Sequence, residues 1–270
     1  MKVAIGTWGY RKWFEEKKCD MFALLDEVKA IGADGIEIFP QHIDRSNTAK
    51  ALADVKAACD AKGLGVASLI CGNDFAARQA HCRAQAVANM IRDIHEASAV
   101  GIDHLNVFTG YHQPGQDPVM ETMRVIDCFR EVTPVAQEKK VSLCLENHSS
   151  VCRDADSILW LIHAVRGESL WTNPDPSNFL PNFTEAPEAQ REVIYTETAK
   201  IVPLAANMHL KIRDFKPDGS HAHLDVSRIL EMLKPVGYDE WIVLEFFGRD
   251  DPHEPNAKGV ALLKRLLSLR

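Results

Sequence analysis

Short apolar runs and amphipathic segments alternate along the whole chain, and this alternation restricts the fold more than any other feature. In a sequence, parallel strands that are covered by helices appear as short, nearly continuous apolar runs. The chain contains eight such runs, and each precedes a segment of helical length. We predict strands at residues 2–7, 34–39, 65–71, 103–109, 141–147, 169–174, 205–212 and 240–247.

The segments between these runs carry apolar residues at helical spacing. In the first of them, Phe22, Leu25 and Val28 recur with a period of about 3.6 residues, which predicts one buried stripe. Helices are predicted at residues 20–31, 47–62, 79–100, 118–139, 154–166, 187–202, 225–236 and 256–268.

Eight strand–helix units predict an α/β fold of one type, a closed (βα)8 barrel, also called a TIM barrel. The length of 270 residues is typical of such a barrel. An open doubly wound sheet agrees less well, because GTWGYR after the first run is a poor match to the G-x-G-x-x-G phosphate turn. No linker or repeat divides the chain, so residues 1–270 are predicted to form a single domain.

Composition and charge argue against several classes of function. The formal net charge of −7 disfavours a broad nucleic-acid or anionic-membrane surface. No window holds about 18 consecutive apolar residues, and the first residues lack the pattern of a signal peptide. The seven cysteines are scattered without a C-x-x-C pair, which fits a reducing compartment. We expect a cytoplasmic protein with a small-molecule partner, and the composition leaves a homo-oligomer open.

Four of the last apolar runs end in a potential metal ligand. Glu146 ends VSLCLE, Asp175 follows LWTNP, His209 lies in NMHLKI and Glu245 ends WIVLE. Because the carboxyl ends of parallel barrel strands face the same cavity, these side chains can meet over the barrel axis. Three carboxylates and one imidazole suit Mn²⁺ best, and Mg²⁺, Co²⁺ or Zn²⁺ also fit. The sequence therefore predicts a site for one divalent metal ion.

Each of these residues also has an ordinary structural interpretation. A single glutamate at the end of a strand often caps a helix or forms a salt bridge, and His209 alone fits a hydrogen-bonded core histidine. The combination favours the metal site, because four successive strand ends all carry a ligand type.

Longer sequence pieces connect the chain to a known group of proteins. These pieces are AIGTWGY, LLDEVKAIGADGIEIF, LNVFTG, LCLENHSS, NPDPSNF, MHLKIRDF and LDVSRILEMLKPVGYDEWIVLEFF. With them the chain resembles the xylose isomerase-like TIM-barrel superfamily, which contains sugar and sugar phosphate isomerases and epimerases and also endonuclease IV. The resemblance implies a metal-dependent isomerase or epimerase that acts on a free sugar, a sugar phosphate or a cyclic polyol.

The same resemblance implies roles for the four strand-end residues. Glu146, Asp175, His209 and Glu245 would hold the divalent ion. In the ketose 3-epimerases of this group, the first and last glutamates also exchange the proton at the reacting carbon. Glu146 and Glu245 would then act as the catalytic acid and base around a metal-stabilised ene-diolate.

Further residues are predicted to bind the substrate. Lys211 and Arg213 follow His209 by two and four positions, so alternation along a strand directs them to the same side. Either one can neutralise an enolate, although Lys211 can equally form a salt bridge with a barrel carboxylate. The remaining candidates are His148 in ENH, Asn178 in DPSNF, Glu37 at the end of the second run and His112 on a loop. Glu37 can also be a buried ion-pair partner. Histidines on loops, such as His112, are more often solvated than catalytic.

Two positions depart from the pattern of the relatives. Asn178 stands where the relatives commonly carry histidine, and it can donate to a substrate hydroxyl but cannot act as an acid near neutral pH. Cys152 stands where the ketose 3-epimerases place a second glutamate. Both changes weaken the match to those epimerases and leave the metal set intact.

Three other functions remain open at this stage. A lyase or dehydratase that acts on keto-sugars or keto-glycosides would keep the metal and the enolate. A barrel that only binds a sugar would keep the pocket without turnover. Endonuclease IV-like DNA repair would need extra imidazole ligands, for which His221 and His223 form a candidate H-x-H pair, but the acidic composition argues against a DNA substrate.

Overall fold

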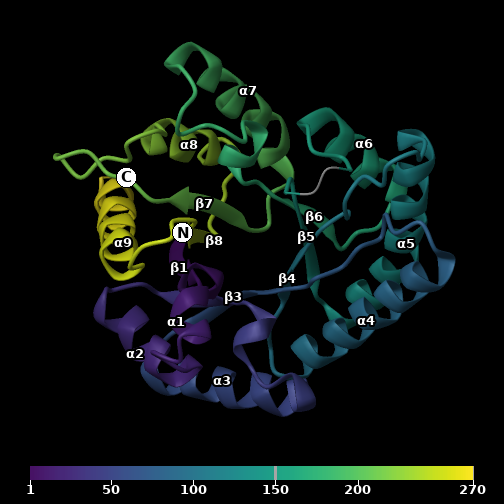
Figure 1. Cartoon of the computed structure of the whole chain (residues 1–270), viewed down its shortest axis with the longest axis horizontal. Helices are drawn as coiled ribbons and strands as arrows, with labels where there is room; N and C mark the ends of the chain where they lie inside the picture. Colours follow the sequence, from purple (N-terminus) through teal and green to yellow (C-terminus); the bar gives the residue numbers. More distant parts are fainter. Residues whose placement is uncertain (149–150, 270) are drawn as a thin grey trace.

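The computed structural model describes residues 1–148 and 151–269, and it confirms the predicted barrel (Figure 1). Eight strands in the described residues form one sheet whose neighbours all run parallel. The strands are β1 (Lys2–Gly6), β2 (Gly35–Ile38), β3 (Gly65–Ile70), β4 (His104–Val107), β5 (Ser142–Glu146), β6 (Leu170–Asn173), β7 (Met208–Ile212) and β8 (Trp241–Phe246).

Helices surround this barrel in the order that the sequence predicts, and a short first helix, which lies between the first and second strands, was not predicted. They are α1 (Arg11–Glu15), α2 (Met21–Ala30), α3 (Thr48–Lys62), α4 (Ala80–Ala99), α5 (Pro118–Lys139), α6 (Ala155–Val165), α7 (Glu192–Ile201), α8 (Val226–Leu233) and α9 (His253–Ser268). Short 3-10 helices extend the connections at η1 (Thr7–Tyr10), η2 (Pro40–His42), η3 (Arg45–Asn47), η4 (Pro176–Phe179), η5 (Glu188–Arg191) and η6 (Val202–Leu204).

The barrel has one weak seam, which lies between β6 and β7. The sheet order is β6-β5-β4-β3-β2-β1-β8-β7, so β1 pairs with both β2 and β8. Across the seam, a single parallel bridge joins Thr172 to Ala205, and the Ala206 amide donates to the Thr172 carbonyl at 3.0 Å. The predicted strand 205–212 therefore begins later, at Met208, because residue 205 forms only this isolated bridge.

Side-chain caps start four of the helices at the residues where the sequence places them. Asp20, Asn47, Asp154 and Asp225 each accept a backbone N–H from the first turn, at 2.8, 3.2, 3.0 and 2.9 Å respectively. Each cap satisfies an amide that has no partner within the helix. The caps fix where the helices begin, and so which residues face the sheet.

The predicted buried stripe of the first long helix is wrong at one position. Leu24, Leu25 and Val28 are fully buried, but Phe22 is 48% exposed. With the helix capped at Asp20, the stripe at spacings of three and four starts at the buried Met21, and Phe22 lies about 100° further around the helix. Met21 therefore occupies the place in the buried stripe that the sequence predicts for Phe22.

All eight strands run parallel, so their carboxyl ends gather at one end of the barrel, where the predicted site residues lie. Within residues 1–148 and 151–269, none of the helices is both long and apolar enough to cross a membrane. At the opposite end of the barrel, where the strands begin, side chains pack closely and fill the interior. The ring of Trp241 at the start of β8 lies against Gly35 and Gly65, which start β2 and β3.

We predict that Gly65→Ala destabilises the barrel by about 1–3 kcal/mol, because a Cβ there would lie 2.6 Å from the Trp241 ring. Urea unfolding followed by circular dichroism measures this loss. Gly72→Ala is the matched control, since a Cβ at Gly72 meets open space and its backbone is not in the left-handed region. Equal stability of the two variants would show that the ring does not pack against Gly65.

Candidate metal centre

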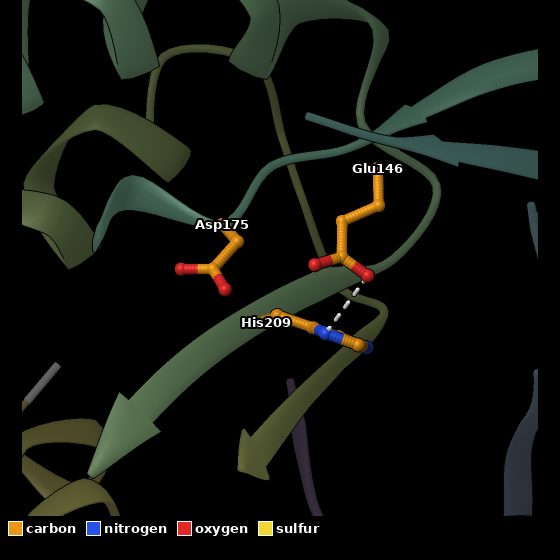
Figure 2. Close-up of side chains that lie close together, drawn as sticks. All are labelled: Glu146, Asp175 and His209. Atoms are coloured by element: carbon orange, nitrogen blue, oxygen red, sulfur yellow. Dashed lines mark ion pairs between the residues drawn. The ribbon is translucent and has the colours of Figure 1, made fainter. Parts of the chain in front are cut away.

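Three of the four predicted ligands meet at the carboxyl end of the barrel. In Figure 2, a dashed line joins the carboxylate of Glu146 to the ring of His209, and the carboxylate of Asp175 lies beside them. One ligand atom from each of the three lies within 4.8 Å of the other two. Glu146 is 3% exposed, Asp175 0% and His209 1%, so the group is shielded from water. Glu146 ends β5, Asp175 directly precedes η4, and His209 lies in β7.

The two nitrogens of His209 have different environments. Nε2 lies 3.0 Å from Oε2 of Glu37, a buried carboxylate on β2 that also accepts a 2.5 Å hydrogen bond from Ser68. Nδ1 lies 3.5 Å from Oε2 of Glu146 and has no hydrogen-bond partner among the residues that the structure describes. A histidine that gives one nitrogen to a carboxylate and leaves the other facing acidic ligands is typical of a metal site.

The Asp175 carboxylate is fixed by the turn that follows it. Its Oδ1 accepts the Ser177 amide at 3.0 Å and the Ser177 hydroxyl at 2.5 Å. The Asp175 backbone is held as well, because its amide donates to the Asn147 side chain at 2.8 Å and its carbonyl accepts from the same side chain at 3.0 Å. Oδ2 remains directed toward the site, where Lys211 reaches it.

The ammonium of Lys211 lies among the same acidic groups. It donates to Asp175, donates to Oδ1 of Asn178 at 2.9 Å, and lies 3.2 Å from Oε2 of Glu245. Glu245 does not join the group whose ligand atoms all lie within 4.8 Å of one another. The lysine therefore bridges Asp175 and Glu245.

The site holds more acidic than basic side chains. Glu37, Glu146, Asp175 and Glu245 contribute four carboxyl groups, whereas Lys211 and His209 are the two basic side chains paired with them. Unpaired charge in a buried site is costly, so this arrangement favours a divalent cation.

The pKa values follow from this excess of buried carboxylates. Burial alone disfavours the imidazolium of His209, but Glu37 and Glu146 outweigh burial and raise its pKa to about 10. Burial raises the pKa of Glu146 despite the nearby charges of His209 and Lys211. Burial acts in the same direction on Asp175, but Lys211 outweighs it and lowers the pKa of that carboxyl.

The donors present fit a divalent ion. Two buried carboxylates and the imidazole nitrogen Nδ1, which has no hydrogen bond, converge, and their mixture of oxygen and nitrogen atoms suits Mn²⁺, Mg²⁺, Co²⁺ or Zn²⁺. Oε2 of Glu245 is also buried, and its contact is the ion pair with Lys211 at 3.2 Å, so it is a candidate for a further ligand. The triad can therefore hold a divalent metal ion.

A cavity of about 260 Å³ opens above these residues. Aromatic side chains from three strand ends form its wall: Trp8, Phe39 and Phe108. Such rings can stack on the apolar face of a sugar. The polar part of the lining includes Glu146, His148, His209, Lys211, Glu245, Asn106 and Gln41.

The predicted substrate residues fall into two groups in the structure. His148 and Lys211 line the cavity, and Asn178 adjoins it by donating to Oε1 of Glu146 at 3.0 Å. Glu37, Arg213 and His112 do not line the cavity. Glu37 lies beneath His209, the exposed Arg213 pairs with Asp214 at 2.8 Å, and His112 pairs with the buried Glu121 of α5 at 2.5 Å.

Sequence reasoning missed several residues that support the site. Asn106 on β4 donates to Oε2 of Glu146 at 2.8 Å and lines the cavity. Asn147 and Ser177 hold Asp175, and Ser68 holds Glu37. A signal existed for Asn106, because it is a polar residue in the apolar run LNVF.

Comparison with known proteins gives the chain a family. The sequence profile of the family described as "Xylose isomerase-like TIM barrel" matches residues 25–266. The chain belongs to this family. A sequence comparison with curated proteins finds no match.

Solved structures that are similar to the chain share its fold at low sequence identity. D-psicose 3-epimerase from Clostridium cellulolyticum H10, solved with D-tagatose, is 17% identical, with a TM-score of 0.77 over 98% of both chains. The 3-keto-D-glucoside 4-epimerase YcjR from E. coli is 17% identical, with a TM-score of 0.73 over 98% of this chain and 99% of that one. A family member from Mycobacterium smegmatis in complex with magnesium is 18% identical, with a TM-score of 0.68 over 91% of this chain and 87% of that one.

The candidate H-x-H metal pair is not formed. Nδ1 of His221 accepts the amides of His223 and Leu224 at 3.1 and 3.0 Å, and Nε2 lies 3.0 Å from the carbonyl of Lys211. Both nitrogens of His221 are therefore used to hold the loop after β7 against the strand.

We predict that this histidine makes the stability of the fold sensitive to acid. Burial lowers the pKa of His221 from 6.5 to about 4, so the unfolded chain takes up a proton first as the pH falls. Its contribution to stability is present above pH 6.5 and is lost between pH 6.5 and about 4, by roughly 3 kcal/mol. Urea unfolding at several pH values should show a smaller acid loss for His221→Gln than for the parent. Parallel pH profiles would contradict this role.

Proposed function

We propose that the protein is a divalent-metal-dependent sugar isomerase or epimerase. The observation that carries the proposal is the buried triad of Glu146, Asp175 and His209, in which Nδ1 of the imidazole has no hydrogen bond. Membership of the xylose isomerase-like family and the sugar epimerases among its structural neighbours support the same class of chemistry. The substrate class is a ketose or a related carbonyl sugar that fits beside the aromatic wall.

Glu146, Asp175 and His209 would hold the ion, and Glu245 would complete the set. We propose Mn²⁺ as the first ion to test, with Mg²⁺, Co²⁺ and Zn²⁺ as competitors, because the set is rich in carboxylates. A divalent ion at this position supplies a Lewis acid that stabilises negative charge on the oxygens of the sugar.

Glu146 and Glu245 would move the proton at the reacting carbon. Both line the cavity, and they belong to different strands, so a sugar can be placed between them. Burial raises the pKa of Glu146, which is the direction that a carboxylate acting as a general base needs. Asn106 and Asn178 each donate to one oxygen of Glu146, which fixes the orientation of the carboxylate.

Lys211 and His148 would position the substrate. The ammonium of Lys211 lies at the cavity wall, where it can neutralise the charge of an ene-diolate oxygen. His148 packs edge-on to Phe108, with their ring centroids 5.5 Å apart, and can offer a nitrogen to a sugar hydroxyl.

Glu37 would serve the same centre indirectly. Because it accepts from Nε2 of His209 and lies outside the cavity lining, we assign it a positioning role and not the substrate contact expected from the sequence. Its hydrogen bond orients the ring and leaves Nδ1 for the metal. Ser68 in turn holds the Glu37 carboxylate.

We expect solvent deuterium to enter one carbon of a ketose when the protein is incubated with Mn²⁺ in deuterated water. Glu146→Gln and Glu245→Gln should each slow this exchange by about 10²–10⁴-fold, because each removes a positioned proton carrier. Proton NMR of a panel of ketoses, inosoles and 3-keto-glycosides measures the exchange.

Glu240→Gln is the matched control, since Glu240 is exposed and precedes β8 at the opposite end of the barrel. Exchange that proceeds at the parental rate in both site variants would refute the two-glutamate mechanism. Exchange followed by loss of water would identify a lyase or dehydratase instead.

We predict that Glu37→Gln weakens Mn²⁺ binding by about 10–100-fold, because the imidazole loses the carboxylate that orients it. Calorimetric titration of the metal measures this directly, and circular dichroism checks that the fold is kept. Glu37→Asp should recover part of the affinity, and Glu240→Gln should bind as the parent does. If Glu37→Gln binds Mn²⁺ with parental affinity, Glu37 does not position His209.

A further inference from the structure

A second hollow lies directly beside the candidate active site. It is a groove of about 650 Å³ between α4 and the connection from β3 to α4. Its floor contains Cys71, Ala86 and Met90, and its walls carry polar side chains of α4 and of the connection. None of the functions assigned above uses this groove.

Gly72 joins the two hollows, because it belongs to the lining of both the cavity and the groove. It is exposed, and a Cβ built on it would meet no atom within 4 Å. The chain therefore passes between the two hollows at a point where no side chain fills the space above it. A ligand in the cavity can extend over Gly72 into the groove.

The rim at this crossing is held in place. The Asn73 side chain donates to the Phe108 carbonyl and accepts the Phe108 amide at 2.9 Å. This pair of hydrogen bonds ties the connection after β3 to the end of β4. Because Phe108 also lines the cavity, the two hollows share a fixed wall, and a bound ligand would not need to order it.

The polar wall of the groove suits hydroxyl groups. Gln85, Asn89 and Asp93 follow one another at four-residue spacing, so they lie on one face of α4. The Gln85 amide donates to Asn89 at 3.0 Å, which aligns two side chains that offer both donors and acceptors. The lining also carries charges of both signs, since Asp74 and Asp93 are accompanied there by the exposed Arg78. A neutral sugar can bond to acceptors and donors alike, so it fits this mixed lining without adding charge.

The volumes of the cavity and the groove also favour a ligand that occupies both. Pockets for small organic ligands usually measure about 300–1,000 Å³. The cavity alone, at about 260 Å³, lies below this range, and the groove adds about 650 Å³ on the far side of Gly72. One sugar ring would occupy the cavity, and a ring attached to it would occupy the groove.

We propose that this groove is a second carbohydrate subsite, so that the substrate is a glycoside or disaccharide whose reacting sugar lies at the metal centre. This inference rests on the proposed function, since the reacting ring is the one that Glu146 and Glu245 would flank. The second ring is neutral and hydroxyl-bearing, and it lies against the face of α4 formed by Gln85 and Asn89.

The test compares D-fructose with the four disaccharides that carry glucose on its 3-, 4-, 5- or 6-oxygen. Calorimetry on the Mn²⁺-loaded full chain gives the affinity for each, and the readout is the ratio of disaccharide to fructose affinity. We expect at least one disaccharide to bind about tenfold more tightly than fructose. Gly72→Val, which places a branched side chain at the crossing, should remove most of this gain, and Asn89→Ala should reduce it.

Ala84→Val is the matched control, because Ala84 is exposed on α4 and does not line the groove, so the ratio should stay at the parental value. The inference is overturned if no disaccharide binds more tightly than fructose, or if the gain survives both groove variants. In that case, deuterium exchange into a monosaccharide would still support the proposed function. Absence of both exchange and sugar binding would overturn the two proposals together.

Discussion

The structure depends on one electrostatic constraint: four carboxylates lie at the carboxyl end of the barrel with only two basic side chains between them. Such a group persists in a folded chain only if each carboxylate is tied to a donor. Asn106, Asn178, Ser68 and Ser177 supply those donors, and Lys211 bridges the acidic residues that face the cavity. This excess of carboxyl groups over basic side chains favours a divalent cation at this end of the barrel.

The fold was largely predictable because the alternation of apolar runs and amphipathic segments acts along the whole chain. The predictions were wrong in detail where local contacts determine which of two neighbouring residues is buried or begins a strand. Phe22 is exposed because the buried face of α2 is formed by Met21, Leu24, Leu25 and Val28, next to which Phe22 lies on the solvent side. The seventh strand begins at Met208 because residue 205 contacts β6 through an isolated bridge and not through a continuous ladder. Helix α1 is too short for a periodic pattern to predict it.

The site was predictable to the extent that strand ends define it. Glu146 is the last residue of β5 and Asp175 follows β6 by two residues, as expected for a site at the carboxyl ends of parallel strands. His209 is the second residue of β7, and its amide donates to the Pro174 carbonyl at 3.0 Å, so it lies beside Asp175 without ending its strand. The direction in which each side chain points could not be predicted from its place in the strand. Glu37 also ends a strand, but it reaches under His209 and not into the cavity. Arg213 follows the end of β7, where strand alternation no longer sets its direction, and it pairs with Asp214.

Asn178 and Cys152, the two positions at which the sequence departs from the pattern implied by the resemblance, have different places in the structure. Asn178 still touches the site, since it contacts both Glu146 and Lys211, but as an amide it can only orient these groups. Cys152 packs beside Thr122 of α5 and does not line the cavity, so the position where the resemblance implies a second glutamate contributes no side chain to the cavity. The triad thus comes from β5, β7 and the turn directly after β6, while Cys152 lies on a connection away from the cavity. In a barrel of this type, the connections carry specificity. The connection after β3, where Gly72 leaves the cavity open toward α4, is therefore the place where this chain would recognise a larger sugar than a cavity of about 260 Å³ can hold.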